Sequence, residues 1–220
     1  MSEISAVIVK KLREETGAGM MECKKALGEA GGDFEKAKII LRKRGIAIAD
    51  KKSARAAKEG IIASYIHVGD KVGVLVEINC ESDFVARNPD FREFVKNITL
   101  QVAAAEPRYV GREDVPAALV DREKDVAVAQ VKNKPPQAIA KIVEGKLDKF
   151  YQTVCLMEQG YVRDQNQTIK DLVQTTVAKL GENIVIRRFI RWKVGEALDG
   201  ALLPVEVPAP AEVSAQPAQS

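Results

Sequence analysis

The chain has 220 residues, of which 46% are hydrophobic and 30% charged, with 34 lysines and arginines against 31 aspartates and glutamates. This composition is typical of a globular protein and excludes a chain that is disordered throughout. The longest apolar runs, such as residues 72–76, are far shorter than the ~20 residues that a membrane-spanning helix needs, so no membrane association is expected.

Residues 1–45 predict three short helices. Ser5 is a suitable cap for the first helix, and residues 20–30 form the second. Asp33 caps the third helix, which is expected to end at Gly45 because glycine commonly terminates helices. Three helices of this length form a small bundle with a thin core.

Residues 46–58 form a connector rich in lysine and alanine, either a solvated helix or a flexible linker. Residues 1–58 together hold 14 lysines and arginines against 8 aspartates and glutamates, a local charge of +6. A basic segment can contact nucleic acid, but the connector has no aromatic side chain on which bases stack. We therefore expect a solvated surface and no direct binding of nucleic acid.

Residues 59–203 predict an α+β core built on an antiparallel sheet packed by helices. Two runs rich in β-branched residues, 61–67 and 72–79, are joined through Gly69 and Asp70, which indicates a hairpin. The other predicted elements are a loop or single helical turn at 81–88, helices at 89–105, 117–131, 137–151 and 168–180, and a last strand at 184–194.

Residues 204–220 predict a disordered tail. They contain four of the nine prolines, four alanines and no lysine or arginine. Such a segment cannot bury enough apolar surface to offset its conformational entropy.

The cysteine and histidine content argues against covalent catalysis. Cys23, Cys80 and Cys155 are odd in number and far apart, so they predict buried, reduced thiols and no disulfide framework or zinc set. A nucleophile of the serine or cysteine type needs a positioned base, and the single histidine, His67, lies in a predicted strand as a surface or edge residue. We therefore expect neither an enzyme nor a metal site, and no cofactor. The N-terminus lacks the pattern of a secretory signal, which favours the cytoplasm, or an organelle if a transit peptide has been removed.

Four blocks of the sequence have a recognisable pattern. They are VKKLREETGAGMMECKKAL at 9–27, EINCESDFVA at 77–86, KIVEGKL followed by KF at 141–150, and GENI through RRF to GE at 181–196. In this order they closely resemble the bacterial-type translation elongation factor Ts family over most of the chain. The family usually has threonine where this chain has Ser82, which keeps the hydroxyl and loses a methyl group.

The resemblance implies a guanine nucleotide exchange factor for elongation factor Tu, the GTPase that carries aminoacyl-tRNA to the ribosome. The first bundle is similar to the family's ubiquitin-associated-like domain. Between residues 105 and 141 the chain has room for neither the second core subdomain nor the coiled-coil insertion of the long form. It therefore resembles the short form, in which two chains pair through the core sheet, and residues 184–194 are the expected contact.

The resemblance also implies a role for Ser82, Asp83, Phe84 and Val85, which match the segment that dislodges Mg²⁺ from elongation factor Tu. Phe84 is the natural wedge, because a ring buried in a partner's cleft contributes binding energy. Asp83 either bonds partner groups or caps the turn that aims the ring. Without the resemblance, the sequence pattern favours a simpler interpretation, in which Asp83 is a helix cap and Phe84 a core residue.

The same resemblance places Leu12, Met20 and Met21 against the GTPase domain of elongation factor Tu. Methionine is common on adaptable binding surfaces, but it also packs small cores, so one of the two methionines is expected to face inward. The alternative function is a basic module that binds RNA or a ubiquitin-like protein and has no exchange activity.

Overall fold

The computed structural model describes residues 4–131 and 135–196, so the predicted tail at 204–220 lies outside the described residues. The helices are α1 (Ala6–Thr16), α2 (Met20–Glu29), α3 (Phe34–Lys52), α4 (Asp83–Arg87), α5 (Pro89–Ala105), α6 (Ala117–Ala129), α7 (Pro136–Val154) and α8 (Ile169–Leu180). The strands are β1 (Glu59–Ile66), β2 (Val72–Cys80), β3 (Gly160–Tyr161), β4 (Asp164–Thr168) and β5 (Val185–Lys193). Two short 3-10 helices are η1 (Arg112–Asp114) and η2 (Leu156–Glu158). Within this part of the chain, none of the helices combines the length and hydropathy needed to cross a membrane.

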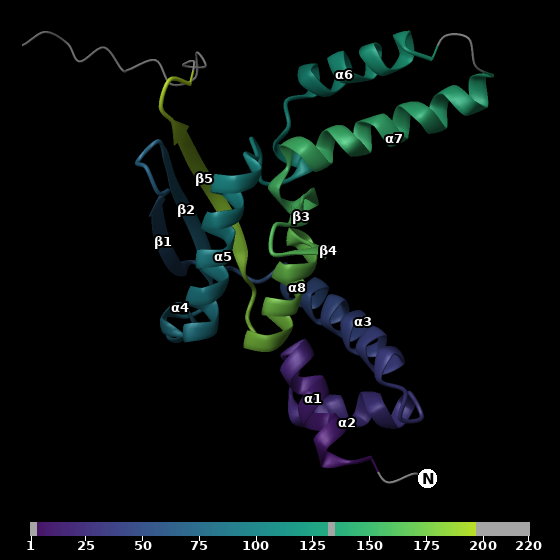
Figure 1. Ribbon diagram of the computed structural model, residues 1–220, viewed down its shortest axis with the longest axis vertical. Helices are drawn as coiled ribbons and strands as arrows, with labels where there is room; N and C mark the ends of the chain where they lie inside the picture. The colour runs from purple at the N-terminus through teal and green to yellow at the C-terminus, as the bar shows by residue number, and fades with distance from the viewer. Residues whose placement is uncertain (1–3, 132–134, 197–220) are drawn as a thin grey trace, which may run out of the picture.

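Helices α1, α2 and α3 form the predicted three-helix bundle at one end of the molecule (Figure 1). The Ser5 side chain accepts a hydrogen bond from the Val7 N–H, and that of Asp33 accepts one from the Lys36 N–H, so both predicted caps are confirmed. The bundle has its own buried cluster, consisting of Val9, Leu12, Cys23, Ala26, Leu27, Ala37 and Leu41.

The prediction that the third helix ends at Gly45 is wrong, because α3 continues to Lys52. Gly45 faces α8, where a Cβ added to it would lie 3.6 Å from the Cβ of Ala178. Ala49 is buried in the core cluster of the α+β part. Packing against α8 thus outweighs the low helix propensity of glycine. The start of the predicted connector is helical, and the domain boundaries at residues 45 and 58 stay predictions.

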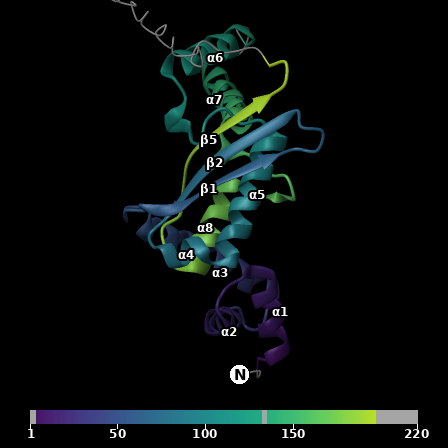
Figure 2. The same cartoon turned by 90° about the vertical axis from the view of Figure 1, so that its left-hand side faces the viewer.

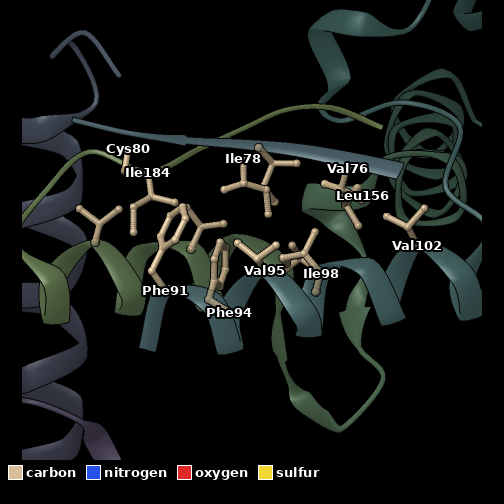
Figure 3. Packing of buried hydrophobic residues seen from close by; sticks show 14 of the residues in the cluster. Val76, Ile78, Cys80, Phe91, Phe94, Val95, Ile98, Val102, Leu156 and Ile184 are labelled. Carbon is tan, nitrogen blue, oxygen red and sulfur yellow. The ribbon is translucent and has the colours of Figure 1, made fainter. Parts of the chain in front are cut away.

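The core contains a three-stranded antiparallel sheet in the order β1-β2-β5, so the predicted hairpin and last strand are confirmed. Inward-facing side chains of β2, among them Val76 and Ile78, are buried against α5. Figure 3 shows these side chains meeting Phe91, Phe94, Val95 and Ile98 from the helix. Their spacing along α5 gives the apolar stripe by which the helix was predicted.

Helices α5 and α8 lie on one face of this sheet, and Figure 2 shows the opposite face in front of them. On that outer face Ile62, Ile66 and Trp192 are exposed. β5 is an edge strand, since it pairs only with β2 among the described strands. The sheet therefore presents an apolar outer face and an edge.

A second, two-stranded sheet of β3 and β4 was not predicted. Its residues contain no β-branched run that could have indicated strands. Instead the buried Gln101 of α5 holds it in place: Gln101 Nε2 donates to the Gly160 carbonyl at 3.1 Å, and its Oε1 accepts from the Val162 N–H at 2.9 Å. Tertiary hydrogen bonds therefore fix this hairpin.

Helices α6 and α7 form a two-helix arm that projects away from the sheet (Figure 1). Ala127, Val131 and Val143 make a small buried cluster between them. The predicted helices at 117–131 and 137–151 are thus confirmed to within a few residues. The expectation that this stretch lacks room for the long form's coiled-coil insertion stays a prediction.

Candidate partner-binding site

The segment of residues 81–88, called here the Phe84 segment, contains the five-residue helix α4 between two caps. The Ser82 side chain accepts from the Val85 N–H at 3.4 Å and caps the start of α4. Asn88 ends α4 and also caps α5, which begins with Pro89. Asp83 lies inside the helix, where it pairs with Arg87 at 2.7 Å. The interpretation of Asp83 as the cap is therefore wrong, because Ser82 has that role.

Phe84 points into solvent, with 80% of its surface exposed. Its neighbour Val85 packs against the core cluster, and Ala86 is buried in it. The interpretation of Phe84 as a core residue is thus wrong. An exposed phenylalanine on a helix whose other face is packed in the core presents a large apolar ring to a partner at little cost in conformational entropy.

Charged and polar groups hold the base of the Phe84 segment. The Glu81 carboxylate accepts a hydrogen bond from the Asn183 N–H at 2.6 Å, and Arg55 lies 3.6 Å away. The hydrogen bond from Asn183, with help from the charge of Arg55, lowers the pKa of Glu81 below its usual value. Glu81 is therefore ionised at neutral pH and joins the segment to the turn before β5.

The three cysteines are free and buried, as predicted. Burial raises the pKa of Cys80 to about 11, with Glu182 adding to the effect. Burial likewise raises the pKa of Cys155 to about 11 and that of Cys23 above its usual value. A reactive cysteine needs a lowered pKa, so these thiols pack as small apolar side chains and remain protonated at neutral pH.

His67 is exposed, as predicted, but it lies directly after β1 and not within the strand. Its Nδ1 is 2.9 Å from the Tyr65 hydroxyl. In the described ranges no three side chains of histidine, cysteine, aspartate or glutamate gather in an arrangement that could hold a metal ion.

The second predicted contact lies at the start of α2. Gly17 takes a φ of 69° and ends α1, so the chain turns sharply before Met20. Met20 and Met21 are 42% and 66% exposed, so the expectation that one of them faces inward is wrong. Leu12 is fully buried in the bundle. Its side chain therefore lies inside the bundle and does not reach the surface.

Both predicted contacts lie toward the same end of the core, since Figures 1 and 2 place α4 at the end nearer the bundle. A groove of about 550 Å³ runs between the bundle and α8. Across it Arg42 donates to the Asp171 carboxylate at 2.8 Å. Burial opposes the ionisation of Asp171, but the Thr168 N–H and Arg42 outweigh it and lower the pKa. The ion pair is one contact between the bundle and the core.

Sequence reasoning missed Glu182, whose carboxylate contacts the Phe84 segment from the turn before β5. Its sequence signals are its position two residues after the predicted helix at 168–180 and its place in the fourth block of the family resemblance, GENI at 181–184. Nothing in the sequence relates that turn to a segment one hundred residues earlier.

Comparison with known proteins shows which protein family this chain belongs to. The family described as "Elongation factor TS" matches residues 43–196. The chain belongs to the elongation factor Ts family. It is 56% identical over 197 residues to "Elongation factor Ts" of Thermodesulfovibrio yellowstonii, an alignment covering 89% of this chain and 98% of that protein.

Two further relatives have the same name. The chain is 58% identical over 196 residues to "Elongation factor Ts" of Coprothermobacter proteolyticus, covering 88% of this chain and 100% of the relative. It is 54% identical over 197 residues to that of Thermotoga petrophila, covering 90% and 99%. The resemblance seen in the four sequence blocks is thus confirmed at the level of the family.

Proposed function

We propose that this chain is a guanine nucleotide exchange factor for elongation factor Tu, acting in the cytoplasm during translation elongation. It forms and breaks no covalent bond and needs no cofactor of its own. The observation that carries the proposal, together with family membership, is the exposure of Phe84 on a helix packed in the core. This chain would bind elongation factor Tu both in its GDP-bound form and in its nucleotide-free form.

The physical requirement on such a factor is differential binding. A GTPase holds GDP through contacts to the phosphates and through Mg²⁺, which bridges the protein and the nucleotide. A factor that binds the empty form more tightly than the GDP-bound form weakens GDP binding by the same factor, because linkage is reciprocal. Each tenfold change in affinity corresponds to about 1.4 kcal/mol.

The Phe84 segment supplies that difference in the proposal. The ring of Phe84 enters a cleft of the partner as the Mg²⁺ site opens, and its burial contributes roughly 1.5–3 kcal/mol. Asp83 lies beside it and can bond partner groups if the exposed Arg87 releases it. Ser82 fixes the start of the helix by capping it, and Val85, in the middle of the helix, fixes it by packing on the core.

The bundle supplies affinity. Met20 and Met21 form an exposed, flexible apolar contact for the GTPase domain, and methionine adapts readily to a partner's surface. Leu12 keeps the turn in place from inside the bundle. With contacts at both the bundle and the Phe84 segment, the two proteins would stay bound while Phe84 acts on the Mg²⁺ site.

The proposal includes a homodimer formed through the core sheet. The outer face carries the exposed Ile62, Ile66 and Trp192, and one edge of β5 has no partner strand within the described residues. Exposed apolar faces and edges of this kind favour pairing with another chain. A second copy presents the same surface, as a two-fold interface requires.

Release of a fluorescent GDP from elongation factor Tu tests the proposal. The release rate should rise with the concentration of this protein and level off once the partner is saturated. The Phe84→Ala variant should reach a lower plateau. An unchanged release rate at micromolar concentrations of the wild-type protein would contradict the function.

A further inference from the structure

Glu182 lies in the short turn between α8 and β5. Gly181 takes a φ of 76° and ends α8 in the left-handed conformation, which any other residue would adopt only with strain. The chain therefore turns away from the helix at this point and brings Glu182 against the Phe84 segment, one hundred residues earlier in the sequence.

Both oxygens of the Glu182 carboxylate bind the start of the Phe84 segment. Oε2 accepts hydrogen bonds from the N–H groups of Glu81 and Ser82, each at 3.0 Å. Oε1 accepts one from the Ser82 hydroxyl at 2.6 Å. Hydrogen bonds to a carboxylate are stronger than those between neutral groups, so this is a firm attachment at the residue that caps α4.

The next residue, Asn183, also binds the start of the Phe84 segment. Its N–H donates to the Glu81 carboxylate at 2.6 Å. Its side-chain amide donates to the carbonyls of Ser53 and Arg55, at 3.3 and 2.7 Å, in the connection from α3 to β1. The Phe84 segment is therefore tied to two distant parts of the chain at its first two residues.

The exposed ring depends on this attachment for its direction. A five-residue helix makes too few internal hydrogen bonds to hold itself, because helix nucleation is unfavourable. Phe84 is 80% exposed and so has little packing of its own. Its orientation is set by the packing of Val85 and Ala86 below and by the attachment at Ser82.

We propose that Glu182 is a positioning residue for Phe84: by binding the N–H groups of Glu81 and Ser82 and the Ser82 hydroxyl, it holds the ring in the orientation that acts on the partner. This inference rests on the proposed exchange function. A ring that is already ordered pays no ordering cost at the moment the metal site opens. Loss of Glu182 should therefore slow nucleotide release and leave the encounter through Met20 and Met21 intact.

The first test compares Glu182→Ala, Glu182→Gln and a control, Glu158→Gln, which removes a carboxylate charge elsewhere in the core, from the ion pair with Arg112. GDP release from elongation factor Tu is measured over a range of factor concentrations. For Glu182→Ala the rate at saturation should fall about tenfold, equivalent to one lost hydrogen bond to a charged group. The half-saturating concentration should change less than twofold. Glu182→Gln keeps the size of the side chain and one acceptor oxygen, so its release rate at saturation should lie between those of Glu182→Ala and the wild type. The Glu158→Gln control should match the wild type.

The second test is a double-mutant cycle, which a merely structural role would not satisfy. In a Phe84→Ala background, Glu182→Ala should change the release rate less than twofold, because the group it positions is already absent. Independent effects that multiply in the double variant would overturn the inference. So would a rise in the half-saturating concentration with an unchanged rate at saturation.

A third measurement separates this inference from the proposed function. Hydrogen exchange of the free protein should show faster exchange of the Glu81 and Ser82 amides in Glu182→Ala, with the amides of β2 and β5 unchanged. Unchanged protection at Glu81 and Ser82 would overturn the inference even if the protein is an exchange factor. If the wild-type protein does not accelerate GDP release, the proposed function and the positioning role both fail, whatever the amides show.

Discussion

Phe84 and Val85 are adjacent in the chain but face opposite environments: Phe84 is 80% exposed, whereas Val85 packs against the core cluster. One residue of the pair thus contributes to the stability of the fold, and the other remains available for a partner. Truncation of Val85 should therefore lower the stability of the fold, whereas truncation of Phe84 should leave the stability nearly unchanged.

Val85→Ala should lower the free energy of unfolding by about 1 kcal/mol, because it removes partly buried methyl groups. Phe84→Ala should change it by less than about 0.5 kcal/mol, since the ring has little packing to lose. Urea unfolding followed by circular dichroism measures both. A larger loss for Phe84→Ala than for Val85→Ala would mean that the ring packs on the protein in solution.

The exposed methionines should determine affinity and leave the rate at saturation unchanged. A Met20→Ala, Met21→Ala double variant should raise the half-saturating concentration in GDP release roughly tenfold, equivalent to about 1.4 kcal/mol of lost apolar burial against the partner. The plateau rate should be unchanged. Val7→Ala is the matched control, because it truncates another exposed side chain of the same bundle. A lowered plateau with unchanged affinity would contradict the division of roles between the bundle and Phe84.

The buried thiols predict a loss of stability at alkaline pH. The pKa of Cys80 and of Cys155 is about 11 in the folded protein, against 9.0 for the unperturbed thiol. Above pH 9 the unfolded chain therefore loses thiol protons that the folded chain still holds, so stability falls as the pH rises toward 11. The urea midpoint should decline over this range, and a Cys80→Ala, Cys155→Ala variant should decline less steeply. Equal slopes for the two proteins would show that the thiols do not cause the decline.

The outer face of the sheet predicts self-association. Sedimentation velocity at increasing concentration should show dimers, and Trp192→Asp should shift the equilibrium to monomers by placing a charge in the buried interface. Val126→Asp, on the projecting helix α6, is the control and should leave the dimer intact. A wild-type protein that stays monomeric at high concentration rules out pairing through the sheet.

Elements with a strong local pattern could be predicted from the sequence. The hairpin of β1 and β2 follows from two β-branched runs around Gly69 and Asp70, and α5 follows from apolar residues at helical spacing after Pro89. Elements fixed by distant contacts could not be predicted. α3 continues through Gly45, where it packs against α8, and β3 and β4 are held by hydrogen bonds from Gln101.

The candidate site shows the same division. The resemblance to a known family could identify the Phe84 segment, but the pattern of apolar residues could not tell which side of α4 faces outward. Phe84 and Phe91 are both phenylalanines near a helix start, yet only Phe91 is fully buried. The contact with Glu182 spans one hundred residues and has no counterpart in local spacing.

The most direct test of the account is GDP release from elongation factor Tu at saturating factor, with wild-type protein and Phe84→Ala, each with and without a chelator of Mg²⁺. With Mg²⁺ present, Phe84→Ala should be slower by about ten- to a hundredfold, corresponding to the loss of roughly 1.5–3 kcal/mol of differential burial. With the metal removed, the deficit should shrink, because the step that the ring promotes has already occurred. An equal deficit in both conditions would show that Phe84 only anchors the complex and does not act on the metal site.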